Sequence, residues 1–166
     1  QTVGDPGQSL RLLHWMMGGI FVTGIGALVP LALPVAAGSL LLFALARELD
    51  LLLLGEDLAF SRGLDARRLR RLLFAVVSVM VGACVAICGP IGFVGLMIPH
   101  GCRRVFGARH RWLLPASALA GGALLALCDT LARTAVAPAE IPVGVITAVI
   151  GAPFFLGLLY TGRTDL

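Results

Sequence analysis

Four long stretches of the chain contain neither a charged residue nor a histidine: residues 20–46, 72–99, 112–128 and 141–160. They contain 17 to 28 residues, and an α-helix needs roughly 20 residues to cross the hydrocarbon core of a bilayer. Barrel strands alternate apolar and polar residues, so continuous runs favour helices as the spanning elements. The composition agrees, because 58% of the 166 residues are hydrophobic and only 13% are charged. The sequence therefore predicts an all-α protein that crosses a membrane several times.

All 13 basic residues are arginine, and the chain contains no lysine. The phosphate-binding P-loop motif requires a lysine, so any ATP that this protein uses must be bound by another subunit. The formal net charge is +4, but arginines between apolar runs are more typical of topology signals than of a phosphate-binding stripe. We therefore expect no nucleic-acid partner.

The cysteines Cys84, Cys88, Cys102 and Cys128 lie inside or beside apolar runs, where a thiol behaves as a small hydrophobic group. Cys84 and Cys88 are one helical turn apart, but no histidine or carboxylate accompanies them, so we expect packing rather than metal binding. An intramembrane enzyme would need paired catalytic groups at membrane depth, and the sequence offers none. We expect no metal, no cofactor and no catalytic residue.

Two arginine clusters indicate the orientation of the chain. They consist of Arg62, Arg67, Arg68, Arg70 and Arg71, and of Arg103, Arg104, Arg109 and Arg111. The positive-inside rule places both clusters in the cytoplasm, so the segment between them must cross the membrane an even number of times. The 28 uncharged residues from 72 to 99 are too many for one span and too few for two.

The sequence Cys88-Gly89-Pro90 marks a break in this segment, because proline lacks a backbone donor and disfavours helix at the residue before it. Residues 72–88 are expected to run outward, and residues 91–102 to return as a short segment of roughly 18 Å. Such a segment needs shielding by neighbouring helices or a cavity, which is typical of transporters and channels.

The remaining segments follow from this orientation. Residues 112–128 run outward, residues 129–140 form an external loop, and residues 141–160 return toward Arg163. Residues 20–46 enter the cytoplasm at Arg47, so residues 1–19 begin outside or at the outer interface. Eleven arginines then lie inside and two, Arg11 and Arg133, outside. The chain starts at Gln1 without a signal-peptide pattern, so we expect a fragment, a processed product or a shortened form.

The cytoplasmic segment, residues 47–71, is divided by Gly55 and Gly63 into short helical pieces, and Asp65 is placed to cap the next span. Leu58, Phe60 and Leu64 give the segment apolar character among mixed charges. This pattern suits a short helix in the groove of a partner. An interfacial turn with snorkelling arginines is the alternative.

Several linked motifs resemble one family. They are "HWMMGG", "LLLLGEDLAFSRGLD", "GPIGFVGLMIPHGCRR", "RWLLPASALAGGALLALCDTLAR" and "IPVGVITAVIGAPFFLGLL". In this order, from about Leu10 onward, they resemble the C-terminal half of the FecCD-type permeases. These are the membrane subunits of ABC importers for ferric siderophores, haem and cobalamin.

The resemblance implies a ten-helix membrane bundle, of which this chain supplies about five helices as a single transmembrane permease domain over residues 1–166. It implies a second permease subunit, identical or not, around a translocation path, an ATP-binding cassette ATPase and an extracytoplasmic substrate-binding protein. The expected location is the cytoplasmic (inner) membrane of a bacterium, and the expected cargo is a ferric siderophore, with haem or cobalamin as alternatives. An incomplete, non-transporting membrane remnant or assembly protein is the rival interpretation.

The resemblance also implies roles for particular residues. Gly55, Glu56, Ala59 and Gly63 match the ATPase-coupling pattern, in which the small Ala59 lets the partner come close. Arg133 corresponds to an external arginine that meets the binding protein, although Asp129 could instead pair with it locally. His100 and Arg103 are expected to close the cytoplasmic end of the short helix rather than to relay protons or bind metal. The residues expected to be structural are Gly92, Phe93, Gly95, Pro99, His100, Arg103, Asp129, Pro142, Gly144, Gly151 and Pro153.

Overall fold

The computed structural model describes residues 12–13, 15–19, 25–135 and 141–161. These residues contain helices and no strand, which confirms the all-α class. The helices are α2 (Ile25–Ala44), α3 (Ala46–Leu53), α4 (Glu56–Ser61), α5 (Ala66–Cys88), α6 (Val94–Phe106), α7 (His110–Thr134) and α8 (Val143–Thr161). The expectations for Arg11, His14 and Arg163 lie outside the described residues, as do residues 136–140 of the expected loop.

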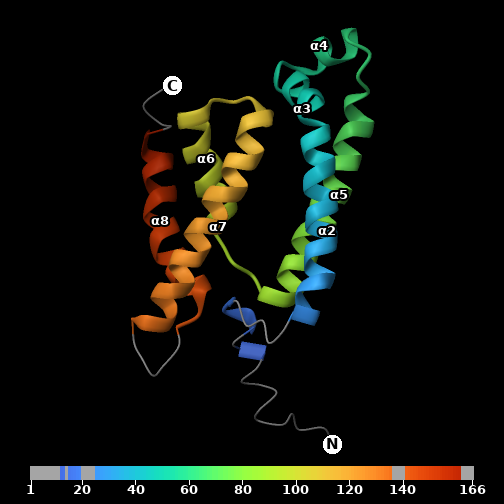
Figure 1. Cartoon of the computed structure of the whole chain (residues 1–166). Helices are drawn as coiled ribbons and strands as arrows, with labels where there is room; N and C mark the ends of the chain where they lie inside the picture. The colour runs from blue at the N-terminus through green and yellow to red at the C-terminus, as the bar shows by residue number, and fades with distance from the viewer. Residues whose placement is uncertain (1–11, 14, 20–24, 136–140, 162–166) are drawn as a thin grey trace, which may run out of the picture.

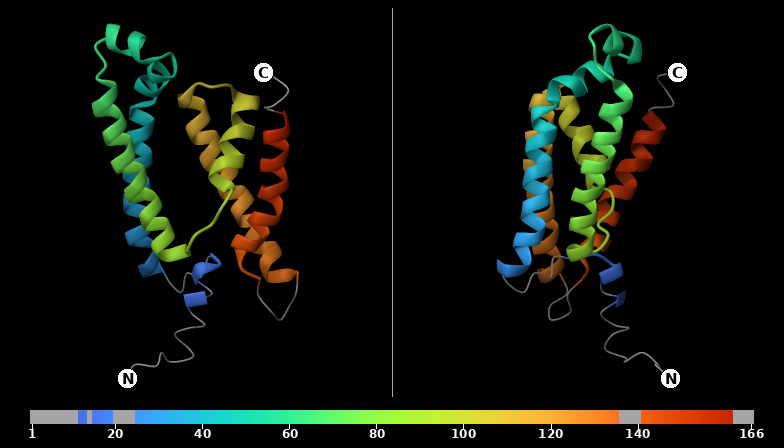
Figure 2. Two further views of the ribbon diagram at one scale, coloured as in Figure 1. Left: turned by 180° about the vertical axis from the view of Figure 1, so that it is seen from behind. Right: turned by 90° about the vertical axis from the view of Figure 1, so that its right-hand side faces the viewer.

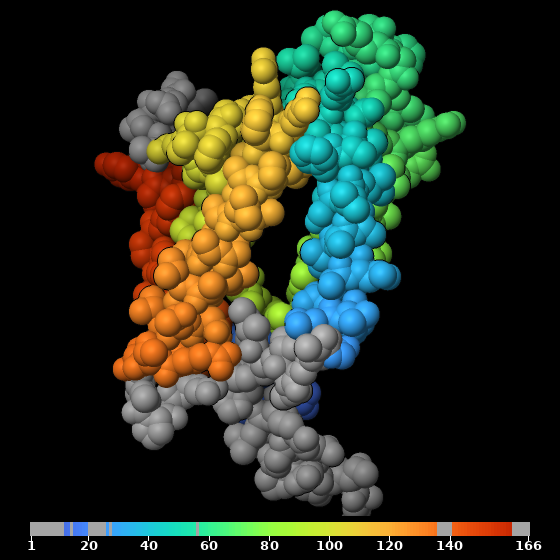
Figure 3. Space-filling view, in the orientation of Figure 1, coloured from blue at the N-terminus to red at the C-terminus, as the bar shows by residue number. Residues whose placement is uncertain are grey.

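The long helices form two groups (Figure 1). In one group α2 runs antiparallel to α5, and in the other α6, α7 and α8 pack together. At one end of the bundle residues 89–93 join the groups, and at the other end α3 contacts α7 (Figure 2). The space-filling view shows an opening between α2 and α7 (Figure 3). The two groups therefore touch mainly at their ends.

Three helices, α5, α7 and α8, are long and apolar enough to cross a membrane. Helix α2 and the following α3 are bent by 58° and pass the same test together. Helix α6 has 13 residues, about 20 Å at ~1.5 Å per residue, which is shorter than the roughly 30 Å hydrocarbon core. Among the described residues, the all-α bundle is therefore confirmed with three candidate spans, or four if α2 and α3 form one bent span. A fifth, short span at α6 stays a prediction.

Helix α5 begins and ends where the local sequence predicts. The Asp65 carboxylate accepts hydrogen bonds from the backbone N–H groups of Arg67 and Arg68, both at 3.1 Å, and so acts as the N-cap. The helix stops at Cys88, and Gly89 follows with a φ of 70°. The predicted break before the short return helix is present, although α6 starts at Val94 rather than at residue 91.

Helix α7 is longer than the sequence suggested. The expected span stopped at Cys128, but the helix continues through Asp129 to Thr134, so half of the expected loop is helical. The Thr130 and Thr134 hydroxyls donate to the carbonyl groups four residues earlier, each at 2.8 Å. The two hydroxyl groups thus find hydrogen-bond partners within the helix itself. The helix therefore continues past the charged Asp129 and Arg133.

The broken stretch between α5 and α6 is held by backbone contacts with two distant segments. Gly19 N–H donates to the Cys88 carbonyl at 2.8 Å, and Gly144 N–H donates to the Gly18 carbonyl at 3.2 Å. A Cβ atom added at Gly144 would clash with the Met17 carbonyl. Residues 15–19, the break and the start of α8 therefore pack backbone against backbone.

We predict that Gly144→Ala destabilises the fold by about 1–3 kcal/mol, because the added methyl group must displace a backbone carbonyl. The measurement is thermal unfolding of the detergent-solubilised chain. Gly157→Ala in the same helix is the matched control, since a Cβ at Gly157 meets nothing within 4 Å. An equal melting temperature for both variants would contradict the proposed close packing.

Candidate functional site

Helix α4 forms a short projection at one end of the bundle (Figure 1). Gly63, with a φ of 78°, ends the helix: its N–H donates to the Phe60 carbonyl at 2.9 Å, and Leu64 N–H donates to the Ala59 carbonyl at 3.0 Å. This pair of bonds is a Schellman motif, which favours glycine at the left-handed position. Gly55, with a φ of 110°, precedes Glu56 at the start of the helix. The expected short helix between two glycines is therefore present.

Apolar side chains of α4 are open to the surroundings. Phe60 is 81% exposed and Leu58 is 56% exposed, and Leu53 and Leu54 at the end of α3 are also exposed. An exposed ring on a short, capped helix suits insertion into an apolar groove. Ala59 behaves differently from our expectation, because it is completely buried within the chain. Its small side chain lets α4 pack on its own neighbours, and it offers no surface to a partner.

A contact between α3 and the start of α7 was not anticipated from the sequence. One oxygen of the Asp50 carboxylate accepts hydrogen bonds from the backbone N–H of His110 at 2.8 Å and from the His110 ring nitrogen Nδ1 at 2.7 Å. Arg109, the N-cap residue of α7, makes no side-chain capping bond. Asp50 thus caps a helix that begins 60 residues later. In the sequence, this contact was indicated only by the lack of a capping residue directly before α7.

The charge state of Asp50 follows from this contact. Partial burial raises the pKa of the carboxyl group, but hydrogen bonds from the backbone and ring of His110 and electrostatic attraction to His110 and Arg109 outweigh it. The pKa of Asp50 therefore lies below its ordinary value of 3.8. A lowered pKa in the folded state means that the carboxylate stabilises the fold above pH 3.8. This contribution is lost as the pH falls through the folded-state pKa.

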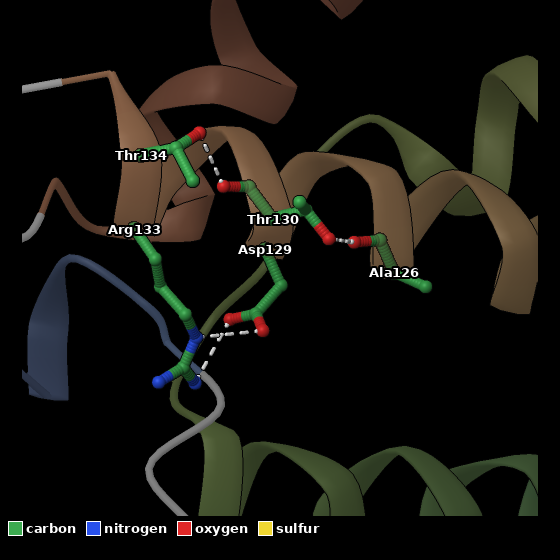
Figure 4. Close-up of polar contacts among 5 residues, drawn as sticks. All are labelled: Ala126, Asp129, Thr130, Arg133 and Thr134. Atoms are coloured by element: carbon green, nitrogen blue, oxygen red, sulfur yellow. Dashed lines mark hydrogen bonds and ion pairs between the residues drawn. The ribbon is translucent and has the colours of Figure 1, made fainter.

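At the far end of α7, Arg133 pairs with Asp129 (Figure 4). Its Nε lies 2.9 Å from Asp129 Oδ2, and one terminal nitrogen lies 3.2 Å from Oδ1, so the guanidinium group holds both carboxylate oxygens. The acidic residue lies four positions before the arginine, which is the favourable order for such a pair. The local pairing that the sequence allowed is therefore present. About half of the Arg133 side chain remains exposed.

The motif residues around the break support the short helix. Phe93 adopts a φ of 68°, a strained value for a bulky residue, and is the N-cap of α6. Gly92 accepts from the Val94 N–H at 2.9 Å, and Gly95 lies in the first turn of α6. A Cβ atom at Gly151 of α8 would clash with Phe93 Cβ, so Gly151 makes room for this ring. These residues thus fix where α6 starts against α8.

The other motif residues lie along α6 and α8. Arg103 occupies the last turn of α6, as expected, but His100 does not, because the helix continues to Phe106. The His100 ring instead meets the Phe154 ring edge-on at 6.1 Å. Pro99 lies inside α6 and Pro153 inside α8, and the Pro142 carbonyl accepts from Val145 N–H at 3.0 Å. Among the described residues no group of three or more histidine, cysteine or acidic side chains could hold a metal ion.

The apolar helices, the broken span and the capped projection define a polytopic helical membrane protein. The chain belongs to the FecCD transport family, whose model matches residues 1–161. It is 51% identical to the cobalamin import system permease protein of Halobacterium salinarum, over 95% of this chain and 42% of the relative. It is 40% identical to the hemin transport system permease protein of Yersinia pestis, over 97% of this chain and 48% of the relative.

A solved structure has the same fold. It is assigned to a metal-chelate type ABC transporter in an inward-facing conformation, and it matches 96% of this chain with a TM-score of 0.86 and 37% identity. The match covers 52% of that chain. This chain therefore spans about half the length of the relatives that it matches. Both relatives are named as permease proteins of transport or import systems.

We predict that Asp50→Ala lowers the free energy of unfolding by about 1 kcal/mol at neutral pH, the usual effect of losing a helix N-cap. Asp50→Asn keeps an acceptor but loses the charge, so its deficit is smaller. That deficit should disappear when the pH falls well below 3.8, where wild-type Asp50 is also neutral. Thermal unfolding in detergent at several pH values measures both effects.

Asp57→Asn on the neighbouring α4 is the matched control for this titration, because Asp57 forms no comparable contact with the start of α7. It should leave the melting temperature unchanged at every pH. If Asp50→Asn and Asp57→Asn give the same profile, the Asp50 contact contributes nothing to stability.

Proposed function

We propose that this chain forms the C-terminal half of a membrane-spanning permease in an ATP-driven importer. The observation that carries the proposal is α4, a short helix between two glycines that exposes Leu58 and Phe60 at the end of the bundle. The chain's relatives include permeases of a cobalamin import system and a hemin transport system. In this proposal the cytoplasmic coupling segment covers residues 47–71, and an ATP-binding cassette ATPase receives α4 in a groove.

The orientation follows from the arginines. Helices α3 and α4, the start of α5, the end of α6 and the start of α7 lie together at one end of the bundle, which we call the arginine-rich end. Arg133 is at the opposite end of α7. The positive-inside rule favours the cytoplasm for the arginine-rich end of a protein in the cytoplasmic membrane. The external connection, expected at residues 129–140, then carries Arg133 on its helical side, where a substrate-binding protein can reach it.

The remaining length of the relatives suggests what completes the bundle. An opening lies between α2 and α7 (Figure 3). We infer that the full permease fills this opening and pairs with a second permease subunit. The rival proposal is a membrane remnant or assembly protein without transport, and the coverage of about half of each relative favours it.

The cargo that we propose is a ferric siderophore, with haem and cobalamin as alternatives. A hollow of about 650 Å³ lies beside the break, and its lining includes Met16, Met17, Phe93, Val145 and Val149. An apolar, weakly binding surface suits the passage of a large chelate. The relatives include a ferric dicitrate permease of Escherichia coli, 48% identical over 70% of this chain, as well as the cobalamin and hemin permeases.

The deciding experiment changes the exposed ring of α4. We predict that Phe60→Asp abolishes co-purification of the cognate ATPase and ATP-dependent uptake of an iron-labelled siderophore by the permease that carries this chain. A carboxylate would enter the apolar groove without a partner there. Phe60→Tyr, which keeps the ring, should retain both activities. Labelled haem and cobalamin, offered in the same assay, distinguish the three cargoes.

Each result of this experiment has a distinct meaning. If Phe60→Asp still binds the ATPase, α4 is not the coupling helix. If this chain never binds the ATPase or supports uptake, while a version extended to the length of its relatives does both, the 166-residue chain is an incomplete subunit.

We predict a second effect at the opposite end. Arg133→Gln should weaken binding of the substrate-binding protein about fivefold at low salt, because an exposed guanidinium pair contributes up to ~1 kcal/mol. Asp129→Asn breaks the same local pair but leaves the arginine, so it should not weaken binding. The measurement is affinity for the binding protein in nanodiscs. Equal effects of the two changes would indicate a local structural role only.

A further inference from the structure

The connection between α6 and α7 combines exposed arginines with exposed apolar side chains. Between Gly101 and Trp112 the sequence contains Arg103, Arg104, Arg109 and Arg111 and no acidic residue. Val105 is 76% exposed and Phe106 is 56% exposed, and Trp112 is 62% exposed in the first turn of a membrane helix. A tryptophan at the end of a span is typical of the level of the lipid headgroups.

A cavity of about 500 Å³ lies next to this connection. It is lined by Arg109, Arg111 and Trp112 of the connection and by Phe43 and Arg47 of the α2–α3 bend. Within the part of the chain that the structure describes, the side chains of Arg47 and Arg111 make no hydrogen bond or ion pair. The cavity thus brings guanidinium groups from two separate elements together.

The charges in the cavity favour an anion. Glu48 and Asp50 also line it; Asp50 is hydrogen-bonded to His110, and one Glu48 carboxylate oxygen is buried without a hydrogen-bond partner. Three guanidinium groups therefore outnumber two carboxylates. Guanidinium groups bind phosphate oxygens through paired hydrogen bonds. Apolar side chains beside these groups suit the glycerol and acyl part of a lipid.

We propose that this cavity binds the phosphate headgroup of an anionic phospholipid from the membrane leaflet at the arginine-rich end. Arg47, Arg109 and Arg111 hold the phosphate, and Trp112 lies against the upper acyl chains. Figure 1 shows that α4 projects farther from the membrane helices than the α6–α7 connection does. A soluble partner held by α4 therefore leaves this connection to the bilayer. The site shares Arg47 with the proposed coupling segment, but it does not include the exposed Leu58 and Phe60 of α4.

The test uses Trp112 as the reporter. The chain has two tryptophans, Trp15 and Trp112, so Trp15→Phe leaves Trp112 alone. The protein is placed in vesicles of phosphatidylcholine and phosphatidylglycerol in which either one or the other lipid carries brominated acyl chains, at equal total composition. We expect stronger quenching of Trp112 when phosphatidylglycerol is brominated. Arg111→Gln should reduce the enrichment about fivefold, the effect of losing one arginine near a charged surface.

Matched variants separate the site from general charge and from unfolding. Arg62→Gln/Arg67→Gln removes two charges from the other arginine cluster and should keep the enrichment. Arg111→Lys keeps the charge and should retain most of the phosphatidylglycerol enrichment. If both Arg111→Lys and Arg111→Gln lose the enrichment and also lose helical circular dichroism, the variants have misfolded. Equal quenching by both lipids, or enrichment that survives Arg47→Gln/Arg111→Gln, would overturn the proposal. Loss of the enrichment on adding inorganic phosphate would also overturn it, because the cavity would then bind free phosphate.

Discussion

The structure depends on satisfying the backbone groups where the polypeptide stops being helical between α5 and α6. Hydrocarbon offers no hydrogen-bond partner, so every exposed N–H and C=O group there must find one within the protein. The Cys88 carbonyl receives the Gly19 N–H, and the Gly18 carbonyl receives the Gly144 N–H. Three segments far apart in the sequence thereby support one break.

Close packing at the break has a direct effect on the arrangement of the helices. The added methyl group of any larger residue at Gly144 would clash with a carbonyl, and one at Gly151 would clash with Phe93. Both glycines lie on α8, so this helix is held against the break at two levels. The group of α6, α7 and α8 is consequently positioned by the break rather than by broad contact with α2 and α5.

Helix α7 connects the two ends of the molecule. Its 25 residues span about 37 Å at ~1.5 Å per residue. Asp50 of α3 holds its first backbone N–H, and Asp129 and Arg133 form an ion pair in its last turns. Because Asp50 joins α3 to the start of α7, these two helices can move as one body. In the proposed importer, such a connection would link the ATPase side to the side that faces the binding protein.

Local chemistry allowed much of this protein to be predicted from its sequence. Continuous apolar runs predicted the membrane helices, Gly89 and Pro90 predicted the break, Asp65 predicted the start of α5, and Gly55 and Gly63 predicted the bounds of α4. Each of these features depends on residues within one or two turns. The extension of α7 to Thr134 was missed because Asp129 and Arg133 neutralise each other on the helix surface.

Only the tertiary structure decided the features that join distant segments. The burial of Ala59, the cap that Asp50 provides for α7, and the meeting of Arg47 with Arg111 around one cavity have no local signature. Periodicity and capping rules describe the chain over a few residues, whereas these contacts depend on how helices far apart in the sequence pack. The sequence by itself therefore determined which segments are apolar enough to cross a membrane and where α5 begins and ends. Packing decided which side chains remain open to partners, because burial depends on the neighbours that folding brings together.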